Sequence, residues 1–304
     1  MNAHTRLAGD IPLGNWVDRY APTVLRPYLR LSRLDRPIGT WLLLLPGWWS
    51  LALSSKFWPD SFHFLLFALG ATVMRGAGCT FNDIIDRDFD GKVARTAARP
   101  IPSGDVSLAQ ASAWLLLQLL VGLLILAQFN NFAIAVGAAS LGLIFPYPFM
   151  KRITYWPQAW LGLTFNWGAL LGWAATTGQL ESPAFLLYSG GLFWTLGYDT
   201  IYAHQDKEDD ALVGVKSTAL RLGDATPLWL VLFYGAAWAL FCAAGWAGGE
   251  HWPFFLLMGA AAAQLGWQIR GLDLNSPLDC LEKFKSNRSF GLIVLAALCA
   301  GKWG

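Results

Sequence analysis

The sequence contains little charge for its length. Only 14% of its 304 residues are Asp, Glu, Lys or Arg, whereas 55% are hydrophobic. A soluble domain typically has about 25% charged residues, so this composition argues against an ordinary water-soluble protein. The net charge of +2 gives no reason to expect nucleic acid as a partner, and none is predicted.

The sequence contains few cysteines. The four cysteines lie in or near apolar segments without paired spacing, so neither structural disulfides nor a zinc site is expected: Cys79, Cys242, Cys280 and Cys299.

The first 30 residues contain no apolar signal core, and Asp10 and Asp18 argue against a transit peptide. Residues 1–36 are expected to form a cytoplasmic N-terminal segment, because they carry six Arg residues and the positive-inside rule applies.

Long apolar runs recur along the whole chain, each close to the ~20 residues with which a helix crosses a bilayer. Tryptophan is abundant, with 17 residues, many of them near the ends of these runs, as is typical of membrane interfaces. We therefore predict an all-α polytopic membrane protein that forms one domain, residues 1–304. Pro46 is expected to break the first span. The nine predicted spans are centred on 38–55, 61–80, 107–128, 131–149, 157–178, 183–203, 226–247, 252–270 and 289–304.

The basic residues are distributed unevenly between the two ends of these spans. If the spans alternate in direction, 19 of the 22 Lys and Arg fall on one side, together with the N-terminus. Lys56 and Lys302 fall on the other side, and Arg75 lies within a span. The positive-inside rule makes the rich side cytoplasmic. We expect an integral protein of the bacterial inner membrane.

Eight of the twenty acidic residues gather in two short clusters. The first lies in FNDIIDRDFDGKVAR (81–95) and the second is DKEDD (206–210), each after an apolar span on the predicted cytoplasmic side. Each contains a DxxxD pair and precedes basic residues and a Gly-Asp pair, at offsets of 120 and 119 residues. This repetition indicates two related halves whose clusters face each other. Solvated loop acids or helix caps are the alternative interpretation.

Helical geometry sharpens the interpretation, provided that the helix before each cluster continues through it. At about 100° per residue, four side chains of the first cluster share one face: Asn82, Asp83, Asp86 and Asp90. In the second cluster the shared face has Asp206 and Asp210, with Asp199 and Tyr202 upstream. Carboxylates four residues apart repel each other unless positive charge lies between them, which indicates a bound cation.

Two known motifs fit only part of the first cluster. Asp86 to Gly91 resembles the start of an EF-hand, but position twelve is Ala97 instead of the closing Glu, so a calcium sensor is excluded. Asp90 to Gly104 resembles the opening of the CDP-alcohol phosphotransferase signature, but its two later aspartates are replaced by Leu108 and Ser112.

A third motif fits throughout. Residues 82–90 read NDxxDxxxD and residues 206–210 read DxxxD, and this pair resembles the UbiA superfamily of intramembrane prenyltransferases. Four further segments resemble the branch of that superfamily that prenylates 4-hydroxybenzoate: LDRPIGTW (34–41), RPIPSG (99–104), YPFMKR (147–152) and GYDTIY (197–202). The resemblance covers nearly the whole chain and implies helices around a central cavity.

The resemblance implies a substrate pair, a cofactor and a pathway. The expected reaction transfers a polyprenyl group from polyprenyl diphosphate, whose tail stays in the lipid bilayer, to the ring of 4-hydroxybenzoate in ubiquinone biosynthesis. Mg2+ is the expected cofactor, because hard oxygen ligands and phosphate oxygens suit it. Another aromatic or quinone precursor is one alternative substrate. A cation-coupled transporter is a rival of a different class, although such proteins usually place their acids near the bilayer midplane.

The resemblance also assigns expected roles to single residues. The metal ligands would be Asn82, Asp86, Asp90, Asp206 and Asp210. Contacts to substrate are expected from Arg87, Lys92, Lys207, Arg152 and Tyr202, each basic residue having a purely topological role as its alternative. Arg152 would hold either the diphosphate or the benzoate carboxylate. Asp199 would orient the phenol or accept the ring proton, unless it makes only a structural hydrogen bond. Asp83 is expected either to bind metal or to support a neighbour.

Overall fold

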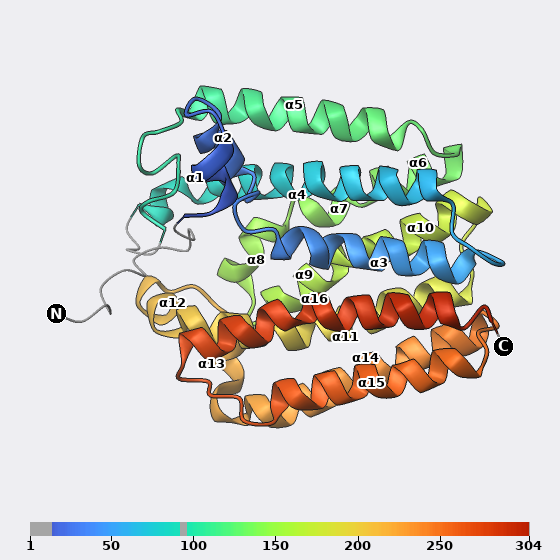
Figure 1. Cartoon of the computed structure of the whole chain (residues 1–304). Coiled ribbons are helices and arrows are strands. Elements are labelled where there is room, and N and C mark those ends of the chain that lie inside the picture. Colours follow the sequence, from blue (N-terminus) through green and yellow to red (C-terminus); the bar gives the residue numbers. More distant parts are fainter. Residues whose placement is uncertain (1–13, 92–95, 304) are drawn as a thin grey trace. The chain divides into compact units, whose positions relative to one another are not determined.

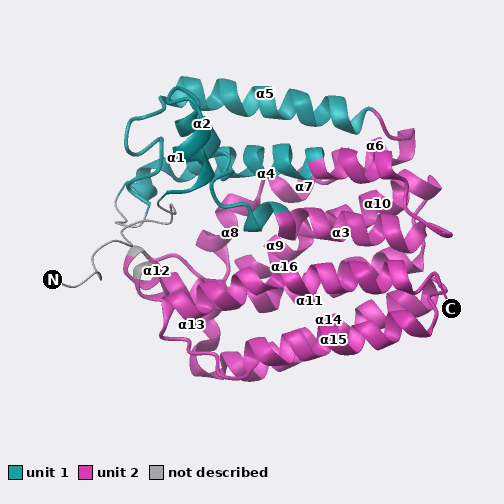
Figure 2. Ribbon diagram, in the orientation of Figure 1, with its two compact units in different colours: residues 1–40, 69–127 teal, residues 41–68, 128–304 magenta. Residues whose placement is uncertain are grey.

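The computed structural model describes residues 14–91 and 96–303. Its regular structure is helical, and no strand occurs in that part of the chain (Figure 1). The predicted all-α class is therefore confirmed. The chain forms two compact units, which Figure 2 distinguishes by colour: unit 1 comprises residues 1–40 and 69–127, and unit 2 comprises residues 41–68 and 128–304.

Unit 1 carries the first acidic cluster. Its helices are α1 (Trp16–Tyr20), α2 (Arg26–Leu31), the start of α3 (Ile38–Ser54), most of α4 (Ser61–Asp90) and α5 (Leu108–Leu126). A small apolar core of Leu31, Val106 and Ala111 packs under α4, where Ile84 contacts it. Ser32 adds a polar joint, because its hydroxyl oxygen accepts hydrogen bonds from Trp114 and Gln118 of α5, each at 2.9 Å.

Unit 2 contains the rest of α3 and the remaining helices. Its long helices are α11 (Ser182–Ala203), α14 (Thr226–Ala247), α15 (Trp252–Ile269) and α16 (Pro277–Ala300). The shorter ones are α6 (Asn131–Ala139), α7 (Leu141–Ile144), α8 (Tyr147–Ile153), α9 (Pro157–Phe165), α10 (Trp167–Thr177), η1 (His204–Asp206), α12 (Lys207–Val213), α13 (Thr218–Leu222) and η2 (Gly223–Ala225).

Helix α11 lies at the centre of unit 2, where it packs against α9, α10, α14 and α16. Its Trp194 is fully buried and lies 5.1 Å from the ring of Trp49 on α3 and 5.5 Å from Phe290 on α16. Trp49 donates a hydrogen bond to the carbonyl oxygen of Gly291 at 2.8 Å, which ties α3 to α16. Because α11 ends at the second acidic cluster, this aromatic core positions that cluster.

Helices occupy each predicted span, with three differences. The expected break at Pro46 is wrong, because α3 continues through it; membrane helices tolerate an interior proline where neighbouring groups compensate for the missing N–H. The fifth span is divided at Asn166, between α9 and α10, and α16 begins at Pro277, well before the predicted start at 289. Four candidate spans meet both length and hydropathy criteria in the described residues, so the count of nine stays a prediction: Ser61–Asp90, Leu108–Leu126, Asn131–Ile153 and Thr218–Ala247.

Candidate active site

The first acidic cluster lies on an unbroken helix. Helix α4 continues through Asp90, as the helical-face prediction required. Asp83, Asp86 and Asp90 are all buried, whereas Asp88 is exposed. The side chain of Asn82 donates a hydrogen bond to Asp86 Oδ2 at 3.1 Å, one helical turn away. An amide and a carboxylate therefore meet on one stripe of α4.

Two arginines neutralise part of this cluster within unit 1. Arg33 donates to Asp83 Oδ1 at 2.8 Å, and Arg99 contacts the same oxygen at 3.2 Å. Arg99 also donates to Asp90 Oδ2 at 2.8 Å, so it bridges two carboxylates. Asp83 is 1% exposed, and Arg33 adopts the left-handed backbone region at φ 57°. This arrangement favours the supporting role for Asp83 that the sequence left open.

Sequence reasoning assigned no site role to Arg33 or Arg99, although Arg99 begins the RPIPSG segment (99–104) that carries the family resemblance. Arg99 lies nine residues after Asp90, just before two prolines and Gly104, which has φ +83°. Such residues are typical of a turn in the chain, so the sequence indicated that the helix does not continue past Arg99. Thr96 supports this turn by donating to the Asp90 carbonyl oxygen at 2.8 Å.

The two basic residues predicted beside this cluster differ in how far the structure describes them. Arg87 is exposed, donates to the Ile84 carbonyl oxygen at 2.9 Å and lies 3.6 Å from the Asp88 carboxylate. Its guanidinium is thus at the surface of unit 1. Lys92 lies outside the described residues.

The second acidic cluster lies at a helix break. Helix α11 ends at Ala203, and η1 intervenes before α12 begins at Lys207. The assumption of one continuous helix is therefore wrong here, although Asp206 and Asp210 remain one turn apart at the start of α12. Both are half-buried. Gly214, in the left-handed region at φ 77°, ends α12 and donates its N–H to the Asp210 carbonyl oxygen.

His204 fixes the turn between α11 and α12. Its Nε2 lies 3.0 Å from Thr226 Oγ1, and that hydroxyl donates its one hydrogen to the Gly223 carbonyl oxygen at 2.7 Å. His204 must therefore donate through Nε2–H. Burial lowers the pKa of His204 to about 4, with the Lys207 charge contributing and Asp224 opposing. A neutral imidazole thus connects the cluster to the start of α14.

Aromatic rings surround the last turns of α11. Tyr198 is buried, with its ring 4.9 Å from that of Trp194, and Tyr202 packs at 4.4 Å against Phe284 of α16. Asp199 lies between these tyrosines in sequence and is half-buried. The Tyr202 and Asp199 side chains are thus held near the second cluster by a packed helix.

Asn166 and Arg152 of unit 2 differ in their surroundings. Asn166 donates to Thr195 Oγ1 of α11 at 2.8 Å, so it bonds a neighbouring helix. Arg152, in the last turn of α8, is exposed and lies 5.9 Å from the Phe149 ring. The N–H of Lys216 donates to the Lys151 carbonyl oxygen at 2.8 Å, which joins the end of α8 to the segment after α12. Arg152 therefore belongs to the same end of unit 2 as the second cluster.

No group of three or more His, Cys, Asp and Glu side chains that could hold a metal ion occurs within residues 14–91 and 96–303. The first predicted ligand set belongs to unit 1 and the second to unit 2. Their convergence on one metal site stays a prediction from the sequence.

Comparison with known proteins gives consistent matches. The model of the UbiA prenyltransferase family matches residues 43–293. The 4-hydroxybenzoate polyprenyltransferase, mitochondrial, of Arabidopsis thaliana is 52% identical over 95% of this chain and 72% of its own length. The proteins of the same name from Aedes aegypti and Homo sapiens are 53% and 52% identical, over 91% and 92% of this chain and 64% and 76% of their own lengths.

Solved structures share the fold. A UbiA homolog from Aeropyrum pernix K1 matches with a TM-score of 0.69 and 25% identity, over 87% of this chain and 97% of that one. A UbiA homolog from Archaeoglobus fulgidus bound to GPP and Mg2+ matches with a TM-score of 0.63 and 18% identity, over 89% of this chain and 99% of that one.

Proposed function

The chain belongs to the UbiA prenyltransferase family, and we propose that it transfers a polyprenyl group from polyprenyl diphosphate to the ring of 4-hydroxybenzoate, releasing pyrophosphate, in ubiquinone biosynthesis. The observation that carries this proposal is the identity of about half of the residues, over more than 90% of the chain, to proteins named for that reaction. The two acidic motifs supply the carboxylates that such a reaction needs to bind a metal–diphosphate group.

We further propose that both units act together in one membrane domain. Their apolar helices and the family make the chain an integral membrane protein. In the proposed topology, the N-terminus and both acidic motifs lie on the side of the membrane that is rich in Lys and Arg, which the positive-inside rule makes cytoplasmic. The relatives reported above are named mitochondrial, so the predicted bacterial inner membrane has no support from their names.

The residues present suit a magnesium-dependent site. Asn82 and Asp86 offer an amide and a buried carboxylate one turn apart, joined by a hydrogen bond of 3.1 Å. Hard oxygen donors of this kind are those that Mg2+ prefers. When bound, Mg2+ would stabilise negative charge on the departing diphosphate. We propose that the ligands are Asn82, Asp86, Asp90, Asp206 and Asp210, with Arg99 orienting the Asp90 carboxylate.

The chain's own cations would complete the electrostatic stabilisation. Arg87, Lys92 and Lys207 are proposed to contact the diphosphate, because fixed positive charge around a leaving group stabilises the transition state. Arg152, exposed at the end of α8, would hold diphosphate or the benzoate carboxylate. The packed rings at the end of α11 would exclude water, so that the allylic carbon reacts with the ring instead of being hydrolysed.

Asp199 and Tyr202 are proposed to position the aromatic acceptor. Asp199 would accept a hydrogen bond from the phenol or take the proton that the ring carbon loses. The hydroxyl-bearing ring of Tyr202 is held by Phe284, so its position is fixed before substrate arrives. Both residues belong to α11, the helix that the aromatic core of unit 2 anchors.

The test is an assay of membranes that contain the full chain, with radiolabelled 4-hydroxybenzoate and polyprenyl diphosphates of several lengths. Product should form with Mg2+, disappear with EDTA and return when Mg2+ is restored. Product formation that resists the chelator would contradict the metal dependence. Uptake of label without a prenylated product would contradict the enzyme proposal and favour the transporter.

A further inference from the structure

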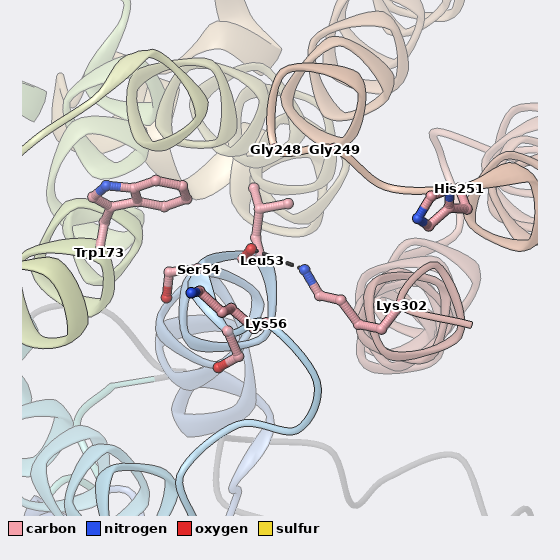
Figure 3. Close-up of a pocket in the computed structure, with 9 residues that line it drawn as sticks. Leu53, Ser54, Lys56, Trp173, Gly248, Gly249, His251 and Lys302 are labelled. Carbon is pink, nitrogen blue, oxygen red and sulfur yellow. Dashed lines mark hydrogen bonds between the residues drawn. The ribbon is translucent and has the colours of Figure 1, made fainter. Parts of the chain in front are cut away.

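A cavity of about 270 Å³ in unit 2 involves none of the residues proposed for prenyl transfer. It lies where four segments meet: the end of α3, the loop between α14 and α15, Trp173 of α10 and the C-terminal residues after α16 (Figure 3). Ligand sites for drug-sized molecules occupy about 300–1,000 Å³, so this space suits a ligand the size of a headgroup.

The lining of this cavity is basic. Lys56, Lys302 and His251 all contribute to it, and no Asp or Glu is part of the lining that the described residues form. In the topology predicted from the sequence, Lys56 and Lys302 are the two of the 22 Lys and Arg that fall on the side opposite the acidic motifs. The structure thus gathers both exceptions to the charge bias at one place, from opposite ends of the sequence.

Two polar contacts fix the side chain of Lys302 at the cavity. Its side chain is 9% exposed, donates to the Leu53 carbonyl oxygen at 3.0 Å and pairs with Glu250 at 2.6 Å. Figure 3 shows its Nζ directed at the Leu53 carbonyl. An ammonium group has three N–H donors, so the two contacts that fix Lys302 leave a third donor.

The backbone keeps the basic groups together. The N–H of His251 donates to the Gly301 carbonyl oxygen at 3.0 Å, which fastens the α14–α15 loop to the residue beside Lys302. Leu53 and Trp173 add apolar side chains to the same lining. A cationic surface with apolar side chains, at the ends of membrane helices, matches the boundary between phospholipid headgroups and acyl chains.

We propose that this cavity binds a phosphate-bearing anion on the membrane face opposite the acidic motifs, with Lys56, His251 and Lys302 facing the phosphate. A phospholipid headgroup and a free phosphate share this chemistry. The inference is independent of the prenyl transfer reaction, because it uses a different set of residues.

The experiment compares the purified full chain with the double variant Lys56→Gln/His251→Gln by native mass spectrometry. Lys302 stays intact, because its loss would leave Glu250 buried without its partner. The probes are phosphatidylglycerol, phosphatidylcholine and inorganic phosphate, each added separately. The matched control is Lys285→Gln, which removes one exposed positive charge from α16 outside the cavity.

The double variant should retain phosphatidylglycerol at least about fivefold more weakly than the unmodified chain, since one basic residue near an anionic headgroup contributes roughly that factor. Lys285→Gln should match the unmodified chain, and phosphatidylcholine should bind more weakly than phosphatidylglycerol. Retention of phosphatidylglycerol alone identifies a lipid headgroup, whereas retention of inorganic phosphate as well shows that the phosphate suffices. Equal retention by the double variant, or equal weakening by Lys285→Gln, overturns the proposal. Prenyl transfer measured on the same samples reports separately on the proposed function.

Discussion

The two acidic motifs have the same spacing but different local structures. In unit 1 the motif lies on a continuous helix, Asp83, Asp86 and Asp90 are buried, and Arg33 and Arg99 pair with Asp83 and Asp90. In unit 2 the motif follows a helix break, and Asp206 and Asp210 are half-buried. Related sequence patterns thus lie on a continuous helix in one unit and after a 3-10 turn in the other.

This difference predicts a division of labour. Buried carboxylates with fixed partners are costly to rearrange, so the first motif is expected to keep its geometry whether or not substrate is bound. The second motif begins a seven-residue helix after a turn, so a shift of its carboxylates on ligand binding requires only local adjustment. The predictions below test this contrast, beginning with the largest expected effect.

Asp86→Asn and Asp206→Asn should each lower the rate of prenyl transfer by about 10²-fold or more, because each removes a charged ligand from the proposed metal site. The rate of product formation at saturating Mg2+ is the measurement. Asp88→Asn, in the first motif but exposed, is the matched control and should retain activity within about twofold. Near-normal turnover in either ligand variant would contradict the proposed site.

Asp83→Asn should destabilise the protein by about 3–5 kcal/mol, because it removes the charge of a carboxylate that is 1% exposed and that Arg33 and Arg99 share. Asp210→Asn should cost less than Asp83→Asn, because Asp210 is half-buried whereas Asp83 is 1% exposed. Thermal unfolding of both variants in detergent provides the comparison. Similar losses of stability would mean that the two motifs are equally embedded, which would remove the contrast.

The fold was largely predictable because apolar runs of membrane length and their charge bias are local properties of the sequence. Pro46 misled the prediction, since a proline breaks helices in water but is tolerated where buried neighbours surround it. The early start of α16 was missed because Lys283, Lys285 and Arg288 interrupt its apolar pattern. Lys283 is nonetheless buried, with its ammonium 3.5 Å from the Trp267 ring centroid.

The candidate site was predictable only where helical spacing applied. On α4 the spacing correctly placed Asn82 beside Asp86. At Asp206 it failed, because a 3-10 turn changes the rise and rotation per residue. The pairing of Arg99 with Asp83 and Asp90 depends on a loop that reverses the chain, and spacing along one helix carries no information about such a contact.

The turn at the second motif should make stability sensitive to pH. His204 has a pKa of about 4 when folded and an ordinary value of 6.5 when unfolded, so the unfolded chain binds more protons between these values. The stabilisation is therefore complete above pH 6.5 and is lost as the pH falls towards 4. Melting temperatures at pH 7 and pH 5, with a chelator present, should show a smaller difference in His204→Gln, which keeps a donor for Thr226. An unchanged pH dependence in that variant would contradict the assignment.

The smallest effect is expected at the two glycines that follow the motif helices. Gly214 has φ +77° with open space around its Cβ position, so Gly214→Ala adds no clash and tests backbone strain alone. We expect the free energy of unfolding to fall by about 1 kcal/mol. The Mg2+ concentration needed for half-maximal activity should rise a few-fold, because the end of α12 loosens behind Asp210. Gly91, which follows α4, lacks a positive φ, and a Cβ there would meet only ordinary contacts. Gly91→Ala should therefore change stability by under about 0.5 kcal/mol. If both substitutions had the same effect on Mg2+ activation, the two motifs would respond alike to a change at the helix end, although only Gly214 of this pair has the left-handed conformation that an alanine adopts at a cost.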